Sequence, residues 1–316
     1  MIVALAGGVG GARLAVGLAA LLPPEQLTVV VNTGDDFEHL GFTVCPDLDT
    51  VMYTLAGLAN PELGWGRADE TWSFMETLGR LGGETWFRLG DHDLAVHVAR
   101  TQALARGEPL SAVTLALSRK LGVAHAIVPM TDDPVRTFVA TDAGELPFQE
   151  YFVRRRCEPA VSGFRFAGSE NAKVPRVLRE LFDSGKVEAA ILCPSNPYVS
   201  IAPMLAVTEI HDWLANRSFP VVAVSPIIGG DAVKGPAAKM MRELGLEASA
   251  AAVAEHYGAL VDGWVIDRRD AGLAPMIAGL AKQVVVTETL MTDRTRSVEL
   301  ARTAVEFAAR IAGHQS

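Results

Sequence analysis

The sequence predicts an α/β protein built on a doubly wound, Rossmann-like and mainly parallel sheet. Two observations predict this fold. Residues 2–31 contain an apolar strand, a glycine-rich turn, a helix and a second apolar strand, and this order is typical of an opening βαβ unit. The same alternation of short apolar strands with helical stretches returns after residue 188, which implies a second half of the same sheet.

Each segment of the first unit has its own sequence signal. The apolar run Ile2–Ala6 predicts a buried strand, and Gly7–Gly11 predicts a tight turn. Ala12–Leu22 predicts a helix, which two consecutive prolines stop at Pro23–Pro24. Leu27–Val31 is apolar and β-branched, so it predicts the second strand.

Three more strands are predicted late in the chain, where apolar runs are separated by helical stretches. The strands are Ala189–Cys193, Val221–Val224 and Val284–Thr287, and the helices between them are Ala202–Asn216 and Ala237–Leu244.

The middle of the chain has a different pattern. Asp69–Leu121 is rich in helix-forming residues, whereas Ala126–Val153 contains short strand patterns with polar turns between them. We therefore expect a single Rossmann-like domain over residues 1–316. In this interpretation residues 60–165 form an inserted helical and short-strand subdomain over the carboxyl edge of the sheet, where it contributes to the substrate site.

Composition excludes several classes of function. A formal net charge of -9 disfavours a nucleic-acid surface, which needs clustered positive charge. Three widely spaced cysteines form neither a disulfide framework nor a zinc pattern. We find no signal-peptide pattern and no apolar stretch that is long enough to span a membrane. We expect a cytoplasmic protein without membrane or nucleic-acid partners, and a homodimer as the default assembly.

The glycine-rich turn is a candidate phosphate site. Glycines between a strand and a helix let the backbone approach an anion, and the start of a helix attracts negative charge. The candidate nucleotide ligands are the backbone amides of Gly8, Val9, Gly10 and Gly11. The turn is not a Walker loop, and Arg13 replaces the third small residue of the dinucleotide fingerprint. Close helix packing remains an alternative reason for these glycines.

Four aspartates follow the second strand within a short stretch, and they are Asp35, Asp36, Asp47 and Asp49. Carboxylate oxygens are the ligands that Mg²⁺ prefers, and a metal that bridges phosphate oxygens is the usual partner of such a cluster. The alternative is that these side chains cap turns and helix starts. The position of the cluster beside a phosphate turn favours metal or substrate binding.

Two later turns follow strands at the same predicted edge of the sheet, and they are Pro194–Pro197 and Ser225–Asp231. Ser195 and Asn196 could donate to phosphate or ribose oxygens, or could cap the helix that begins near Ile201. Lys234 comes at an expected helix start, where the helix dipole disfavours a cation, so a bound anion would explain it. The alternative is a solvated lysine, which needs no such partner.

Aromatic residues surround a polar segment near residue 90. Trp86 and Phe87 precede Arg88, and they could form either core or a stacking wall for a flat ring. His92 lies in the same segment, but no serine or cysteine nucleophile motif accompanies it. Hydrolytic triads are therefore unsupported.

In combination, these motifs resemble the 2-phospho-L-lactate transferase family of coenzyme F-420 biosynthesis. The order of the motifs matches from the first strand to about Met241. The motifs that carry the resemblance are Gly7–Arg13, Asn32–Asp36, Cys45–Thr50, Trp86–Asp91 and Pro194–Pro197.

The resemblance implies a reaction and a set of site residues. The family moves a phospholactyl, phosphoenolpyruvyl or phosphoglyceryl group from a guanosine diphosphate derivative to the terminal hydroxyl of the deazaflavin FO, and GMP is released. It implies that Asp49 and Arg88 contact FO and that Asp35 and Asp47 lie near Mg²⁺. The glycine turn and the Ser195–Asn196 turn would hold the nucleotide.

Physical reasoning agrees with this allocation, because such transfer asks a protein mainly to align the reacting oxygens and to neutralise charge. We expect Asp49 to orient or deprotonate the attacking alcohol. Trp86 is expected to contribute to substrate binding.

Two alternative functions are also compatible with parts of the sequence. One is a nucleotide-sugar-binding regulator of the gluconeogenesis-factor type, which shares a glycine-rich first turn without transfer activity. The other is a nicotinamide-dependent dehydrogenase, which would need an acidic residue at the end of the second strand, where Asn32 stands.

Overall fold

A seven-stranded parallel sheet forms the centre of the computed structural model, which describes residues 1–62, 64–280 and 282–315. Its order from one edge to the other is β5-β2-β1-β9-β10-β13-β14. The strands are β1 (Ile2–Ala6), β2 (Leu27–Val31), β5 (Ala126–Pro129), β9 (Ala189–Leu192), β10 (Val221–Val224), β13 (Gly263–Asp267) and β14 (Gln283–Thr287). The predicted doubly wound, parallel fold is confirmed.

The chain changes direction across the sheet between β1 and β9. From β1 it proceeds outward through β2 to β5, and from β9 it proceeds the other way to β14. Loops that leave the carboxyl ends of β1 and β9 therefore diverge to opposite faces, which opens a crevice between them. The predicted glycine turn and the Ser195–Asn196 turn both lie at this switch point.

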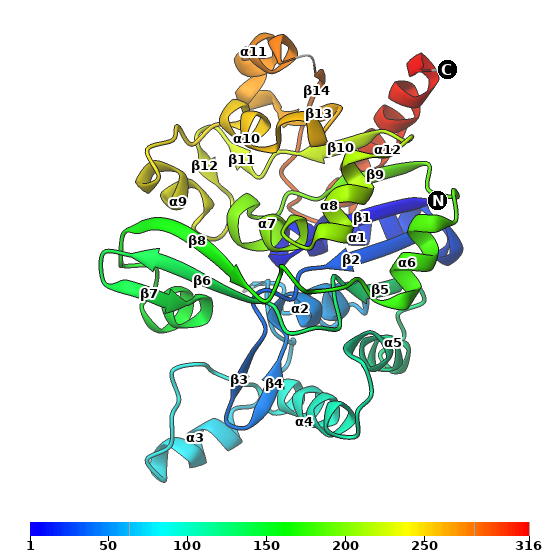
Figure 1. Cartoon of the computed structure of the whole chain (residues 1–316). Helices are drawn as coiled ribbons and strands as arrows, with labels where there is room; N and C mark the ends of the chain where they lie inside the picture. The colour runs from blue at the N-terminus through cyan, green and yellow to red at the C-terminus, as the bar shows by residue number, and fades with distance from the viewer. Residues whose placement is uncertain (63, 281, 316) are drawn as a thin grey trace.

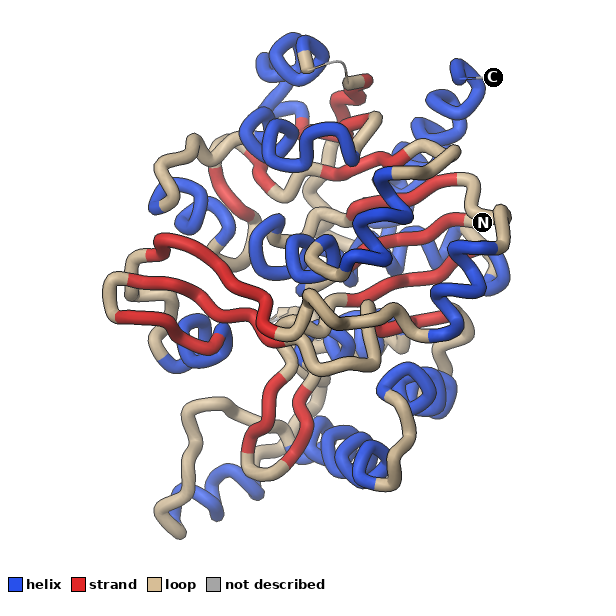
Figure 2. Tube along the Cα trace, viewed as in Figure 1, coloured by secondary structure: helices blue, strands red, loops and turns tan. Residues whose placement is uncertain are grey.

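Strict alternation along the strands divides the core into two layers. Ile2, Ala4 and Ala6 face one layer, whereas Val3 and Leu5 face the other. Burial on both faces is typical of parallel sheets and explains why these strands are continuously apolar. Figure 2 shows the strands side by side in one sheet, with helices on both of its faces.

Helices from distant parts of the chain cover the two faces of the sheet. The first layer contains α1 (Gly8–Leu21), α2 (Pro46–Leu55), α5 (Leu110–Lys120) and α12 (Arg294–Gln315). The second layer contains α6 (Arg176–Asp183), α7 (Ala202–Leu205), α8 (Thr208–Ala215), α9 (Ala237–Glu243) and α10 (Ala250–Tyr257).

Smaller elements surround the sheet (Figure 1). They include a hairpin of β3 (Phe37–His39) and β4 (Phe42–Val44), the helices α3 (Ser73–Arg80), α4 (Asp91–Ala105) and α11 (Ala274–Gly279), and a pair of β11 (Ile227–Ile228) with β12 (Asp231–Ala232). A three-stranded antiparallel sheet contains β6 (Arg136–Thr141), β7 (Gly144–Pro147) and β8 (Val161–Ala167). Short 3-10 or π turns span Pro24–Gln26, Glu150–Arg154, Pro197–Ile201, Gly258–Leu260 and Arg268–Leu273.

The middle region is helical and then rich in short strands, as expected. The hairpin and α3 extend away from the sheet (Figure 1). Within the range 60–165, however, β5 pairs in parallel with β2 and is the edge strand of the main sheet. The additional elements therefore enter on both sides of β5. Before it come β3, β4, α3 and α4, and after it come β6, β7 and β8.

Three details differ from the sequence predictions. Helix α1 begins at Gly8, so most of the predicted glycine turn is helical. The single helix predicted for 202–216 is two helices, because Val207 adopts an extended backbone between α7 and α8. Strand β13 was not predicted, since glycine and aspartate bound its short apolar run. Within the described residues we find no helix with the length and apolar composition that a membrane span requires.

Contact between α1 and α12 gives a test of the packing. A Cβ built on Gly17 of α1 would lie 2.1 Å from the carbonyl oxygen of Ser297 in α12. We expect Gly17→Ala to lower the free energy of unfolding by about 3 kcal/mol in a urea titration, because backbone must move to admit the methyl group. Gly279→Ala in α11 is the control, since open space surrounds that position. An unchanged stability for Gly17→Ala would contradict this helix contact.

Candidate active site

The start of α1 is held by two side chains from other parts of the chain. The amide of Gly7 donates to Ser195 Oγ at 3.0 Å, and the same hydroxyl donates to the carbonyl of Gly7 at 2.8 Å. The amide of Gly8 donates to Asp47 Oδ1 at 2.7 Å. Because the cap position is Gly7 and carries no side chain, these remote residues satisfy amides that a helix start leaves open.

The glycines allow this close approach. A Cβ on Gly10 would lie 2.3 Å from the carbonyl oxygen of Pro194, and one on Gly11 would lie 2.6 Å from Ser195 Oγ. Gly8 also has a φ of +60°, which favours glycine. Close packing, the alternative that the sequence left open, is therefore one requirement for these glycines. It does not conflict with phosphate binding at the same turn.

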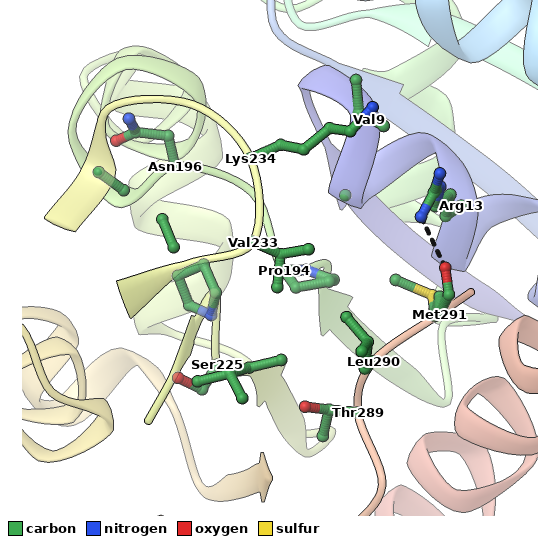
Figure 3. A pocket seen from close by; sticks show the side chains of 15 residues that line it. Val9, Arg13, Pro194, Asn196, Ser225, Val233, Lys234, Thr289, Leu290 and Met291 are labelled. Carbon is green, nitrogen blue, oxygen red and sulfur yellow. Dashed lines mark hydrogen bonds between the residues drawn. The ribbon is translucent and has the colours of Figure 1, made fainter. Parts of the chain in front are cut away.

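A pocket opens at the first turn of α1, between the carboxyl ends of β1, β9, β10 and β14 (Figure 3). We call it the switch-point pocket. Its described lining residues are Val9, Gly10, Arg13, Pro194, Asn196, Ser225, Pro226, Ile228, Ala232, Val233, Lys234, Ala237, Thr289, Leu290 and Met291.

The charge of the switch-point pocket is opposite to that of the chain. Its described lining includes the cations Arg13 and Lys234 but no carboxylate, although the chain as a whole has a net charge of -9. The first-turn amides of Val9 and Gly10 add the positive end of the α1 dipole. An anionic group is therefore the ligand that this pocket favours.

A second pocket lies on the other side of the same helix start. It is lined by Val9, Arg13, Thr54, Gly57, Ala59, Asn60, Pro61 and Gly64, and we call it the α2-side pocket. Val9 and Arg13 belong to both pockets, so the two spaces adjoin at the first turn of α1. Arg13 Nη1 donates to the carbonyl of Met291 at 2.6 Å, which ties the helix to the loop after β14 (Figure 3).

Ser195 and Asn196 both have structural duties in the turn after β9. The Ser195 hydroxyl is engaged with Gly7, as described above. The Asn196 side chain accepts from the amides of Tyr198 and Val199, so it caps the following turn. Asn196 also lines the switch-point pocket, whereas Ser195 shapes that pocket by positioning Gly7. Nucleotide contact by either side chain stays a prediction.

Asp35 and Asp47 are brought together by an amide. Asn32 Nδ2 donates to Asp35 Oδ1 and to Asp47 Oδ2, at 2.9 Å in each case. Burial raises the pKa of Asp35 well above its usual range, and the charge of Asp47 raises it further. Burial also raises the pKa of Asp47 to about 6, although hydrogen bonds from Asn32, Gly8 and Ser200 oppose the shift. Two buried carboxylates thus share one neutral donor.

This pair fits a divalent cation. Mg²⁺ commonly uses one or two carboxylates and completes its shell with water and substrate phosphates. The mutual repulsion of Asp35 and Asp47 would be relieved by such an ion, and the amide of Asn32 cannot supply a full charge. The hydrogen bond from Gly8 to Asp47 also places this pair beside the start of α1.

Asp49 belongs to a different cluster. Both of its oxygens accept hydrogen bonds from the buried guanidinium of Arg100, on α4. His97 Nδ1 lies 3.7 Å from Asp49 Oδ2, and His97 Nε2 lies 3.4 Å from Asp93 Oδ2. Tyr53 donates to Asp93 at 2.6 Å. The carboxylate of Asp49 is therefore paired with a permanent internal cation.

Helix geometry explains why Asp47 and Asp49 separate. Both lie in the first turns of α2, and residues two positions apart on a helix point about 200° away from each other. Asp47 therefore faces α1, whereas Asp49 faces α4. Asp36 lies near Asp49 and Arg100. Burial raises the pKa of Asp36 to about 7, and a hydrogen bond with Cys45 opposes the shift.

Asp49, Asp93 and His97 could in principle hold a metal, because their ligand atoms lie within 4.8 Å of one another. Arg100 already occupies the cation position beside Asp49. A second cation there would repel the guanidinium. The Asp35–Asp47 pair is therefore the better candidate for Mg²⁺.

The aromatic residues form a small cluster under the β3–β4 hairpin. Trp86 contacts Phe37, His39 and Phe87, with ring centroids 5.2–6.1 Å apart. Trp86 is partly exposed, so one part of the ring packs while another remains accessible. The Arg88 guanidinium lies over the ring of Trp72, 4.1 Å from its centroid. Roles for Trp86 and Arg88 in substrate binding stay predictions.

Sequence reasoning missed several residues of the site. His97 and Arg100 lie one and two turns beyond Asp93 on α4, and this polar face of a helix was the available signal. Thr289, Leu290 and Met291 line the switch-point pocket, but their segment carries no motif. Only the position of β14 in the sheet brings that segment to the pocket.

Comparisons with known proteins agree over almost the whole chain. The family described as 2-phospho-L-lactate transferase CofD matches residues 2–303. A phosphoenolpyruvate transferase of Streptomyces coelicolor is 45% identical over 317 residues, with 98% of each chain covered. A 2-phospho-L-lactate transferase of Methanopyrus kandleri is 41% identical over 314 residues, again with 98% of each chain covered.

A solved structure shares the fold. A UPF0052 family protein of Bacillus halodurans has a TM-score of 0.62, with 96% of this chain and 98% of that chain covered. Its sequence identity is 13%, so this likeness concerns the fold alone.

The Asp35–Asp47 pair predicts how stability depends on pH and metal. Burial and the charge of Asp47 raise the pKa of Asp35 well above its usual range, and burial raises the pKa of Asp47 to about 6. The folded state therefore binds protons more strongly than the unfolded chain, and both carboxyl groups lower the stability as the pH rises above their unfolded pKa values. We expect Asp35→Asn to raise the unfolding free energy at pH 8 in EDTA by about 2 kcal/mol. Mg²⁺ should raise the melting temperature of the original protein but not that of the variant.

Asp183→Asn is the matched control, because Asp183 lies at the exposed end of α6 and should leave both effects unchanged. An equal Mg²⁺ response in Asp35→Asn and the original protein would remove Asp35 from the metal site.

The buried pair of Asp49 and Arg100 predicts a coupled loss of stability. Asp49→Asn or Arg100→Met alone should lower the free energy of unfolding by about 3–5 kcal/mol, because each leaves a buried group without its partner. The double variant should lose less than the sum of the two. Urea titrations of all four proteins give the coupling, and additive losses would contradict it.

Proposed function

Because the chain belongs to the 2-phospho-L-lactate transferase CofD family, we propose that it carries out one transfer step in coenzyme F-420 biosynthesis. It moves a phosphate-linked three-carbon acid from a guanosine diphosphate donor to the terminal hydroxyl of the deazaflavin FO, and GMP leaves. The single observation that carries this proposal is the cationic switch-point pocket at the first turn of α1, which adjoins a pair of buried carboxylates.

The donor occupies the switch-point pocket in this proposal. The amides of Val9 and Gly10 bind diphosphate oxygens, and Arg13 supports the loop at Met291 that closes one side. The apolar part of the lining, which includes Ile228 and Leu290, faces the nucleoside.

Asp35 and Asp47 hold Mg²⁺, as their geometry and raised pKa values support. When bound, the ion supplies positive charge to the diphosphate and to the leaving GMP. Asn32 keeps both carboxylates oriented by donating to each of them. Gly8 fixes the position of Asp47 relative to α1.

The acceptor hydroxyl attacks the phosphorus that carries the three-carbon acid. A new phosphorus–oxygen bond forms, and the bond between this phosphorus and the oxygen that leaves with GMP breaks. The hydroxyl proton passes to Asp49 and from there to water, and the product is a phosphodiester. Asp49 accepts the hydrogen bond of the hydroxyl and orients it, since Arg100 holds both carboxylate oxygens in place. Trp86 and Arg88 contribute to the deazaflavin site.

We propose the phosphoenolpyruvyl derivative as the first donor to test. The relatives from Streptomyces that bear the name phosphoenolpyruvate transferase are 44–45% identical to this chain, against 41% for the 2-phospho-L-lactate transferase of Methanopyrus kandleri. The phospholactyl and phosphoglyceryl derivatives are the alternatives.

A direct assay tests the proposal. Purified protein with FO, Mg²⁺ and each guanosine diphosphate donor should release GMP and form the FO phosphodiester, which mass spectrometry detects together. Removal of Mg²⁺ with EDTA should lower the rate at least about 100-fold, since charge neutralisation is lost. Nucleotide binding without product from any donor would instead favour the regulator.

The proposed role of Asp49 is tested by comparing the turnover of a variant with its affinity for GDP. We expect Asp49→Asn to lower kcat about 100-fold or more while the Kd for GDP changes less than threefold. The assay is made below the melting temperature of the variant, because the loss of its pair with Arg100 destabilises the fold. Unchanged turnover would remove the proposed role.

A further inference from the structure

Three chain segments meet at the boundary between the two pockets. Lys234, from the loop after β12, extends toward Val9 at the first turn of α1 (Figure 3). Its Nζ donates to the carbonyl oxygen of Glu62 at 3.2 Å. A Cβ built on Gly64 would lie 2.9 Å from Val9 Cγ1 and 3.0 Å from Lys234 Nζ. The ammonium therefore lies at the junction, beside residues of both pockets.

The ammonium of Lys234 lies where the helix dipole of α1 disfavours a cation. The ammonium of Lys234 lies near the positive end of the α1 dipole, and Arg13 lines the same pocket. The first turn of α1 contains no acidic residue, and the described lining of the switch-point pocket contains none. Asp47 meets the start of α1 at the Gly8 amide but is not among the described lining residues of the pocket. The described lining thus carries positive charge, which a bound anion would balance.

The order of the two pockets indicates which part of an anion would lie there. A donor whose nucleoside fills the switch-point pocket directs its diphosphate along the start of α1, toward Val9 and Arg13. The lining of the α2-side pocket also includes Val9 and Arg13, so the three-carbon acid would extend to that side. The phosphate at the junction is then the second one, which carries the three-carbon acid.

We infer that Lys234 binds the phosphate that is transferred, and that it distinguishes a nucleoside diphosphate from a monophosphate. This inference rests on the proposed function. On binding, the ammonium exchanges its hydrogen bond to the carbonyl of Glu62 for one to a charged phosphate oxygen, which is the stronger acceptor.

A structural role is the competing explanation. Through its bond to Glu62, Lys234 also ties the segment at Glu62 to the loop after β12. A tether of this kind would shape the whole site, so its loss would weaken the binding of mono- and diphosphates alike. A phosphate contact would affect only the ligand that carries the second phosphate.

Calorimetric titration with GDP and with GMP separates the two explanations. In GDP the second phosphate stands for the transferred one, whereas GMP lacks it. We expect Lys234→Met to weaken GDP binding about tenfold or more and to change GMP binding less than threefold. Lys234→Arg should retain most of the GDP affinity, since it keeps the charge. Each titration is made in EDTA and again in Mg²⁺, so that the metal contribution is separate.

Lys120→Met is the charge-matched control, because Lys120 is exposed at the end of α5 and lines neither pocket. It should leave both affinities unchanged. Equal weakening of GDP and GMP in Lys234→Met would overturn the inference in favour of the tether. Unchanged GDP binding would also overturn it, while the proposed donor would stand. Failure of the original protein to bind either nucleotide would instead overturn the proposed donor, and the inference with it.

Discussion

The hydrogen bonds that hold the start of α1 are the constraint on which the rest of the site depends. A helix start leaves backbone amides that need acceptors, and Gly7 has no side chain with which to supply one. Ser195 at the end of β9 and Asp47 at the start of α2 supply them. The three segments are thereby fixed at one point, and the glycines permit an approach that any Cβ would prevent.

Electrostatics divides this point into regions of opposite charge. On one side the buried carboxylates of Asp35 and Asp47 share a neutral amide, so a cation would offset the repulsion between them. On the other side Arg13 and Lys234 face a pocket that favours an anion. The diphosphate donor that we propose, together with Mg²⁺, would meet both requirements, because the metal would neutralise the carboxylates and the phosphates would neutralise the cations.

Asp49 shows that sequence proximity does not imply a shared task. Its charge is balanced inside the protein by Arg100, so it does not need an exchangeable ion. The pair holds the carboxylate in a fixed orientation at the cost of desolvating both charges, and such a cost is often accepted where a functional group must be positioned. Phe37 and His39 of the neighbouring β3–β4 hairpin contact Phe87 and Trp86 in the aromatic cluster.

Local patterns in the sequence were sufficient for the fold class, the opening βαβ unit and the polar residues at the strand ends. Apolar strands, glycines after a strand and carboxylates after the next strand are adjacent in the chain, and parallel topology collects them at one edge of the sheet. Strand β13 and the break at Val207 were not predicted, because nearby residues there gave no strong signal.

Only the tertiary structure decided which of these polar groups are partners. The bonds from Gly7 to Ser195 and from Asp49 to Arg100 join positions far apart in the chain. The loop at Met291 reaches the pocket because β14 ends at the same edge of the sheet as β1. Such contacts depend on how whole elements pack, whereas the spacing of residues in the chain reports only what neighbours can form. The sequence therefore determined the chemistry available at the site, and packing determined how that chemistry is divided.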